Sequence, residues 1–254
     1  MLSFRPLLVI SWCIFSLLTA TPLAAKAAMP DAEVILNYNV NASNSWYPYY
    51  IAQTPEAPGV LGEIIPKILA LANIKSRKHN FPPKRTNQAL EKGFLDFDVV
   101  SPSWFEEKQL ADTFVASNPI MPIMENIVVL EKNQQRWQRL SQIKGRNIGT
   151  VRGYLYHDDN EFTRVDFKSE RELILALHKG RIEAAISGDY PALYWAKELN
   201  LPISLAAVHS SGDLVIRLRK EHIALLPAIN QAIQTLKDSG ELQQIIDKYT
   251  LATP

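Results

Sequence analysis

The chain contains almost no cysteine: Cys13 is the only one among 254 residues. It lies in an N-terminal segment with the three-part layout of a secretory signal, in which Arg5 precedes the apolar run 7–18 and small residues follow. We expect residues 1–27 to be a signal peptide cleaved after Ala27. The remaining chain then has no thiol, which excludes disulfides, cysteine metal ligands and a cysteine nucleophile.

Long apolar runs are also missing. Beyond the N-terminal segment, no run approaches the 18 or more apolar residues of a membrane span. We therefore expect the mature chain to be exported and soluble. The alternative, an uncleaved membrane anchor, is disfavoured because the run 7–18 is itself too short to span a bilayer comfortably.

Charge of one sign is lacking as well. The chain has 27 basic and 26 acidic residues, a formal net charge of +1. Removal of Arg5 and Lys26 with the signal changes it to −1, since +1 − 2 = −1. A near-neutral exported protein has no electrostatic basis for binding nucleic acid, so we expect no such partner.

Catalytic motifs are absent too, including Gly-x-Ser-x-Gly and His-Glu-x-x-His. The five histidines are scattered, and only His157 has acidic neighbours, Asp158 and Asp159. A polar loop explains these three residues more simply than a metal site, which needs further ligands at defined spacing. Glu63 and Glu125 are plausible cleft acids, although both occupy positions that read as exposed. We expect no enzyme activity, no metal and no cofactor.

What the sequence does contain is one unit used twice. "ALEKGFLDFDVVSP" begins at Ala89 and "ALHKGRIEAAISGD" at Ala176. Each copy predicts a helix that ends on glycine, Gly93 or Gly180, followed at once by an apolar strand. Near-continuously apolar strands are typical of parallel α/β sheets covered by helices. Chance remains an alternative, since helix-glycine-strand is common in α/β proteins.

The surrounding order predicts two α/β lobes. We expect strands over 33–40, 76–81, 146–151 and 203–208, and helices over 61–74, from about 86, 169–180 and 191–200. Segments 124–133 and 213–220 read as strands that cross between the lobes. The tail predicts two helices, broken at Ser239 and Gly240, that return to the first lobe.

In open α/β sheets, ligands bind beyond the carboxyl ends of the strands. Asp189 follows the second apolar strand, where an unpaired carboxylate would be costly in a closing cleft. Its partner could be a protein cation such as Arg152 or Lys108, or the ammonium group of a ligand. Alternatively, Asp189 caps the helix that begins near Pro191.

Two other post-strand segments offer binding groups. Aromatic residues crowd around Pro48 and could stack on a ligand or cover their own core: Trp46, Tyr47, Tyr49 and Tyr50. Gly153 would let the backbone approach a bound anion, and Arg152 could pair with a carboxylate. A surface arginine at a turn is the alternative.

From about residue 33 to residue 250 the chain resembles the periplasmic solute-binding proteins of ABC importers, extracellular family 3 (polar amino-acid-binding-like), type II. The resemblance is carried by "SWYPYY", "GVLGEIIPKIL", "LEKGFLDFDVVSPSW", "SQIKGRNIGTVRGYLY" and, most specifically, "AINQAIQTLKDSGELQQIIDKY". It implies a two-lobe α/β venus flytrap with a two-strand hinge. Lobe 1 would comprise 28–127 and 216–254, and lobe 2 would comprise 128–215.

The resemblance also implies a function. A small polar or amino-acid-like ligand would bind between the lobes of a periplasmic monomer and pass to a membrane permease. The alternatives are a ligand-sensing subunit for a membrane receptor and a cyclohexadienyl-dehydratase-like enzyme. The ligand-binding residues implied by the post-strand segments and the resemblance are Trp46, Tyr47, Tyr49, Ser101, Ser103, Trp104, Lys108, Arg152, Gly153, Tyr154 and Asp189.

Within this set, the resemblance assigns Asp189 to a ligand ammonium group and the amides at Gly153 and Tyr154 to a ligand carboxylate. Amino-acid binders usually clamp that carboxylate with Thr-x-x-Arg, whereas this chain has "SPSWFEEKQ", with Lys108 the nearest cation and out of register. Lysine lacks the two-pronged fit of arginine to a carboxylate, which argues against an ordinary amino acid as ligand.

Overall fold

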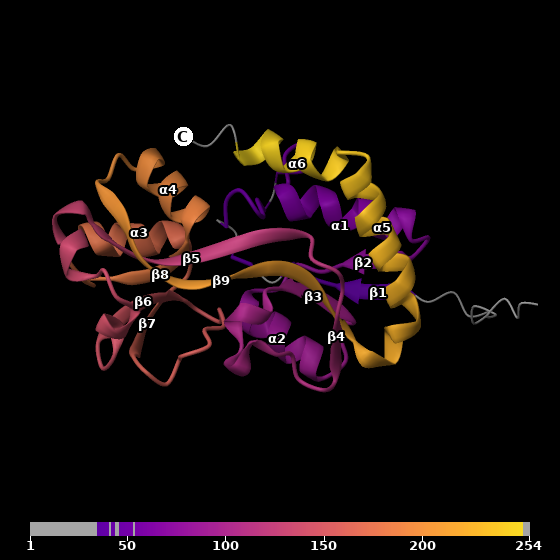
Figure 1. The fold of residues 1–254 in the computed structure, drawn as a ribbon, viewed down its shortest axis with the longest axis horizontal. Helices are drawn as coiled ribbons and strands as arrows, with labels where there is room; N and C mark the ends of the chain where they lie inside the picture. Colours follow the sequence, from indigo (N-terminus) through magenta and orange to yellow (C-terminus); the bar gives the residue numbers. More distant parts are fainter. Residues whose placement is uncertain (1–34, 41, 44–45, 53, 251–254) are drawn as a thin grey trace, which may run out of the picture. The chain divides into compact units, whose positions relative to one another are not determined.

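The computed structural model describes residues 35–40, 42–43, 46–52 and 54–250 (Figure 1). The expected signal peptide, 1–27, lies outside these residues. The described strands pair in the order β2 (Lys75–Lys78), β1 (Ile35–Tyr38), β3 (Phe97–Val100), β9 (Ile203–Arg219), β5 (Met121–Leu130), β8 (Ala185–Gly188), β6 (Asn147–Val151) and β7 (Thr163–Phe167), with β4 (Phe114–Ala116) also on β9.

Two groups of parallel strands lie at the ends of this series. In one group β1 pairs with β2 and β3, and in the other β6 pairs with β7 and β8. Two antiparallel strands, β5 and β9, join the groups, since β9 pairs with β3 as well as with β5, and β5 pairs with β8. The expectation of an α/β protein is confirmed.

Strand β9 corrects one prediction. The sequence suggested separate strands over 203–208 and 213–220, because the polar stretch between them reads as a break. Instead, Ile203–Arg219 is one strand. Its residues 203–214 pair with β5 and residues 215–219 with β3 and β4, so hydrogen bonds to its neighbours keep the polar middle extended.

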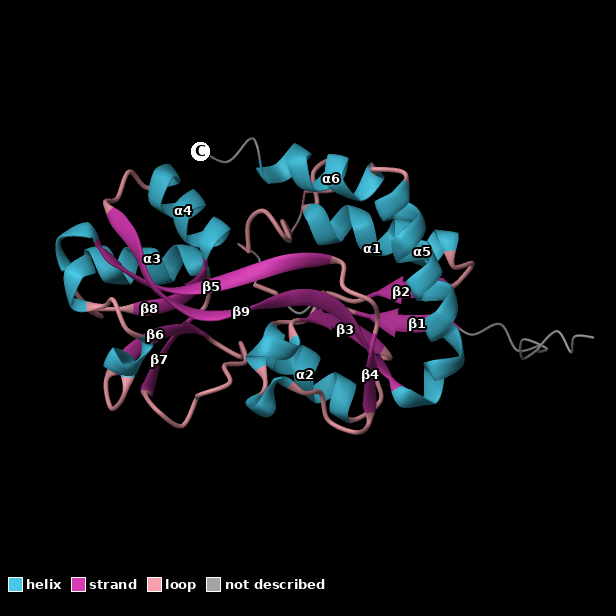
Figure 2. Cartoon of the chain, in the orientation of Figure 1, coloured by secondary structure: helices cyan, strands magenta, loops and turns pink. Residues whose placement is uncertain are grey.

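Helices cover both groups of strands (Figure 2). The first group carries α1 (Val60–Leu71), α2 (Pro83–Glu91), α5 (Leu226–Asp238) and α6 (Glu241–Thr250), and the second carries α3 (Glu170–His178) and α4 (Asp189–Glu198). The two tail helices share a core with α1, as Ile229, Ile233 and Ile245 pack in the same buried cluster as Ile64 and Ile68. None of the described helices is long and apolar enough to cross a membrane.

The repeated unit folds as its sequence predicts. The helices α2 and α3 end just before Gly93 and Gly180, whose φ angles of 73° and 64° are left-handed. Glycine adopts this conformation without steric cost, so it can end a helix and start the turn into a strand. The strands that follow, β3 and β8, are fully buried. The lobe boundaries at 127/128 and 215/216 stay a prediction.

A buried ion pair connects β3 to β9. Arg217 donates through Nε to Asp98 Oδ1 (2.8 Å) and through an amino group to Oδ2 (2.6 Å). The two side chains are only 7% and 0% exposed, and they lie opposite each other in the strand register. Two aromatic rings, Phe105 and Phe114, lie against the guanidinium. Both charges are therefore desolvated and depend on each other.

Replacement of Asp98 tests this dependence. Asp98→Asn should lower the free energy of unfolding by about 3–5 kcal/mol, because it leaves Arg217 charged and unpaired in the interior. Urea unfolding provides the measurement.

The matched control lies two residues further along β9, where Arg219 pairs with Glu221, whose side chain is 55% exposed. Glu221→Gln should cost about 1 kcal/mol or less, because solvent screens this pair. Equal losses in the two variants would contradict the assignment of Asp98.

Candidate functional site

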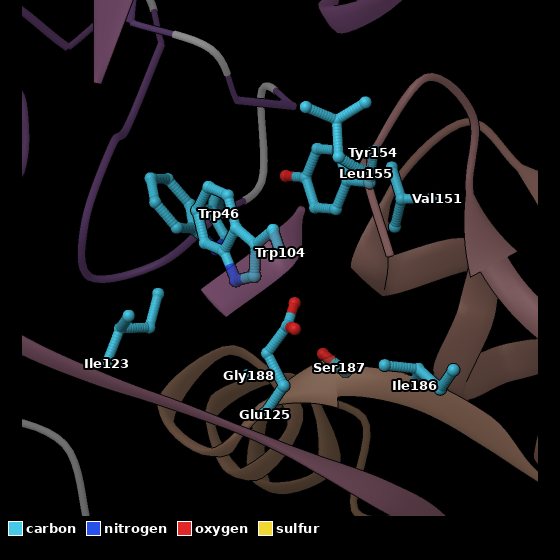
Figure 3. A pocket seen from close by; sticks show the side chains of 10 residues that line it. All are labelled: Trp46, Trp104, Ile123, Glu125, Val151, Tyr154, Leu155, Ile186, Ser187 and Gly188. Carbon is cyan, nitrogen blue, oxygen red and sulfur yellow. The ribbon is translucent and has the colours of Figure 1, made fainter. Parts of the chain in front are cut away.

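A pocket lies where the two groups of strands approach each other. In this conformation the cavity is small, about 20 Å³, which is space for about one water molecule, so the lobes must part to admit a larger molecule. Its lining comes from the loop after β1, the turn after β3, strands β5 and β8, and the loop after β6. The lining residues are Trp46, Trp104, Ile123, Glu125, Val151, Tyr154, Leu155, Ile186, Ser187 and Gly188 (Figure 3). Three of them, Trp46, Trp104 and Tyr154, belong to the set expected from sequence.

Glu125 is the one acidic side chain among the described residues of this lining. The sequence suggested a plausible cleft acid in an exposed position. The exposed position is wrong, because the residue is only 6% exposed. Its Oε2 accepts a hydrogen bond from the hydroxyl of Ser210 (2.6 Å). Strand pairing places it opposite Gly188 on β8 and Ser210 on β9, so its burial depends on residues distant in sequence.

Behind Glu125 lies a second carboxylate, and one histidine serves both. His209 Nδ1 is 3.6 Å from Glu125 Oε2, and His209 Nε2 is 2.9 Å from Asp158 Oδ1. Burial alone would lower the pKa of His209, but hydrogen bonds and the charges of both acids outweigh it and raise the pKa to about 9. Burial would raise the pKa of Asp158, yet the contact with His209 holds it below its usual value. His209 is therefore an imidazolium at neutral pH.

Two further polar atoms in the lining have no hydrogen-bond partner among the described residues. They are Trp104 Nε1 and Ser187 Oγ, and both are buried. Figure 3 shows the indole nitrogen, the serine hydroxyl and the Glu125 carboxylate turned toward the same space. Buried polar groups are normally satisfied, so these atoms favour a bound molecule that satisfies them.

Tyr154 forms part of the pocket wall, but its hydroxyl bonds to residues outside the pocket lining. It donates to Glu170 Oε1 (2.6 Å) and accepts from the backbone N–H of Ser43 (3.0 Å). Ser43 Oγ also donates to Glu170. Burial and the Glu170 carboxylate raise the pKa of Tyr154, which keeps this hydroxyl protonated. The contact joins the loop after β1 to the start of α3.

Gly153 and Arg152 lie beside this contact. A Cβ on Gly153 would come within 2.4 Å of the Lys84 backbone nitrogen, and its φ is +82°, so only glycine fits there. Its carbonyl accepts a hydrogen bond from Asn87 (3.1 Å). The exposed Arg152 lines a separate hollow with Lys84 and Lys168. Neither residue is part of the pocket lining.

The other expected residues lie around the pocket without lining it. Ser101 and Ser103 share a hydrogen bond (2.8 Å) and pack against Gly212 of β9. Lys108 is exposed in the short helical turn Glu106–Lys108. Tyr47 stacks on Tyr194 of α4, with ring centroids 3.7 Å apart.

Asp189 is the first residue of α4, and Tyr49 lies near it. Its Oδ1 accepts from the backbone N–H of the next residue, Tyr190 (2.7 Å), whereas the N-cap of α4 is Gly188 and no described side chain caps the helix. Burial raises the pKa of Asp189, and no ion pair to it is found within the described residues. Burial and the Asp189 charge also raise the pKa of Tyr49. The carboxylate thus borders the aromatic wall while bonding to its own helix.

Residues 38–252 match the model of the bacterial extracellular solute-binding proteins, family 3. The chain belongs to this family. Its members bind solutes, so the family is one of binding proteins.

Individual relatives are more distant. The chain is 27% identical over 145 residues to an arginine-binding periplasmic protein of Mannheimia haemolytica, a match that covers 52% of this chain and 57% of that protein. An ancestral arginine-binding protein bound to arginine has a TM-score of 0.69 at 20% identity, covering 85% and 98% of the two chains. A histidine kinase sensor domain with similarity to periplasmic binding proteins has the same TM-score, 0.69, at 16% identity. This match covers 85% of this chain and 96% of the sensor domain.

These structures confirm the two-lobe periplasmic-binding-protein-like fold of type II. At such identities they show the fold alone.

The His209 contact predicts a pH dependence of stability. Because folding raises the pKa of His209 from 6.5 to about 9, its contribution is complete below pH 6.5 and is lost as the pH rises through 9. The difference corresponds to on the order of 3 kcal/mol. Urea unfolding between pH 6 and pH 10 should show this loss in the wild type and not in His209→Gln.

His178→Gln is the control, because His178 is exposed at the end of α3. This variant should keep the pH profile of the wild type. A His209→Gln profile parallel to that of the wild type would contradict the assignment.

Proposed function

We propose that this protein captures a small polar or amino-acid-like solute in the pocket between its lobes and delivers it to an ABC-type membrane permease. The observation that carries the proposal is the pocket itself: apolar walls enclose one carboxylate and two unpartnered polar atoms, where both lobes meet. Family membership supports a solute as the bound molecule. The periplasm is the compartment this role requires, with residues 1–27 removed as a signal peptide.

Contacts between the lobes provide a closing mechanism. They flank the pocket and include the hydrogen bonds among Ser43, Tyr154 and Glu170 and the stacked rings of Tyr47 and Tyr194. β5 and β9 are the two strands that run from one lobe to the other, and we propose that they form the hinge. A solute that contacts both walls would then stabilise the closed form.

A sensor subunit is the second candidate, because a histidine kinase sensor domain has the same fold. In that role the closed form would dock on a membrane receptor instead of a permease. The adjacent gene separates the two candidates, since a transporter needs a permease and a sensor needs a signalling partner.

A thermal-shift screen of amino acids, amines, aromatic acids and short peptides tests the proposed function. A ligand at 100 times its dissociation constant should add about 2.7 kcal/mol to the free energy of unfolding. Trp104→Phe should weaken the binding of any hit up to about tenfold, since it removes an indole N–H donor and keeps the ring.

Trp195→Phe is the matched control, because Trp195 lies on α4 and does not line the pocket. Equal weakening in both tryptophan variants would contradict a ligand contact at Trp104. A complete screen without a shift would contradict the proposed function.

Closure can be measured separately with dyes on Lys92→Cys and Glu183→Cys, two exposed positions, one on each lobe. Tyr154→Phe removes the hydroxyl between Ser43 and Glu170, which should cost the closed form about 1–3 kcal/mol. We expect this variant to shift the dye distance toward longer values without ligand.

The control is Tyr156→Phe, because the Tyr156 hydroxyl contacts only its own lobe, at the N–H of Val151. An unchanged distance distribution in Tyr154→Phe would contradict a role for this hydroxyl in closure.

A further inference from the structure

One oxygen of the Glu125 carboxylate faces the pocket without a donor in the described part of the chain. Glu125 and Asp158 flank His209, and His157 lies 3.9 Å from Asp158 on the side away from Glu125's contact. Glu125 Oε2 faces Ser210 and His209, but no described residue donates a hydrogen bond to Oε1. Oε1 is therefore the carboxylate oxygen left for a ligand at the pocket wall. A buried carboxylate oxygen without a donor is costly, and a cationic ligand would remove that cost.

Among the described lining residues, none is basic and able to hold an anionic group of a ligand. Of these ten, Glu125 alone is acidic, and six are aliphatic or tryptophan. The two basic residues that the sequence suggested as ligand contacts do not line the pocket. Arg152 lines the separate hollow with Lys84 and Lys168, and Lys108 is exposed.

The neutral polar atoms complete the description of the ligand. Trp104 Nε1 is a donor only, so it fits an acceptor atom of a bound molecule. Ser187 can accept from an ammonium group or donate. The rings of Trp46 and Trp104 lie 6.2 Å apart and can contact either an apolar body or the cation itself.

We propose that the pocket binds a protonated amine with an apolar body and without a carboxylate group, held by Glu125. This inference rests on the proposed function and narrows it to one class of solute. The ammonium group donates to Glu125 Oε1 and Ser187 Oγ, and the apolar body lies between the tryptophans and Ile123, Val151 and Ile186. A carboxylate on the same ligand would lie near Glu125, and none of the described lining residues is basic and able to neutralise it.

Matched pairs of compounds test the inference on the wild-type protein. Phenethylamine differs from phenylalanine, and isoamylamine from leucine, by the carboxylate alone. Calorimetry should give the amine of each pair a dissociation constant on the order of 100-fold lower than that of the amino acid. Phenylalaninamide, in which a neutral amide replaces the carboxylate, should bind like the amine.

Glu125→Gln tests the assigned carboxylate. It keeps the shape of the side chain and removes its charge, so we expect amine binding to weaken on the order of 100-fold and the preference over the parent amino acid to disappear. Glu183→Gln is the matched control, because Glu183 is exposed and outside the pocket. Circular dichroism and urea unfolding check that both variants fold.

The outcomes separate the inference from the proposed function. Amino acids that bind as tightly as their amines would overturn the inference and leave the solute-binding role intact. Loss of amine binding in Asp189→Asn with full binding in Glu125→Gln would also overturn it, because the ammonium site would then be Asp189. Failure of every compound class to bind would overturn both.

Discussion

The antiparallel pairing of β5 with β9 is the constraint on which the site depends. It joins two groups of parallel strands that would otherwise be separate, and it sets which side chains face the pocket. Glu125 lies opposite Ser210 in this register, next to His209. A shift of one residue would turn Glu125 to the other face and separate it from both partners. The register of two long strands therefore fixes the charge of the pocket.

Burial then determines the chemistry of that charge. A carboxylate on a solvent-exposed strand would be screened by water and would select no particular ligand. Glu125 is instead 6% exposed, between apolar walls and a histidine that also serves Asp158. In this low-dielectric setting the carboxylate attracts a cation and repels an anion more strongly than it would in water. The geometry thus converts a common acidic residue into a determinant of specificity.

Much of the fold could be predicted from the sequence, because it is encoded locally. Glycines after α2 and α3 mark the ends of both helices, and the apolar runs of β3 and β8 predict buried strands. The break at Gly240 separates α5 from α6, where φ is +74°. By contrast, β9 was predicted as two strands. The polar residues around Ser210 are extended because they pair with neighbouring strands, and the local sequence does not encode that pairing.

The site was predicted less completely, for the same reason. Trp46, Trp104 and Tyr154 follow strand ends and were found by that rule, whereas Glu125 lies within a strand and owes its burial to β8 and β9. Asp189 begins α4 immediately after β8, so its carboxylate bonds to its own helix. Its neighbour Gly188 faces Glu125. A crystal structure of the complex with a bound amine tests this account most directly. We predict the amine nitrogen within hydrogen-bond distance of Glu125 Oε1, between Trp46 and Trp104; a nitrogen bound to Asp189, or a ligand outside this pocket, would contradict it.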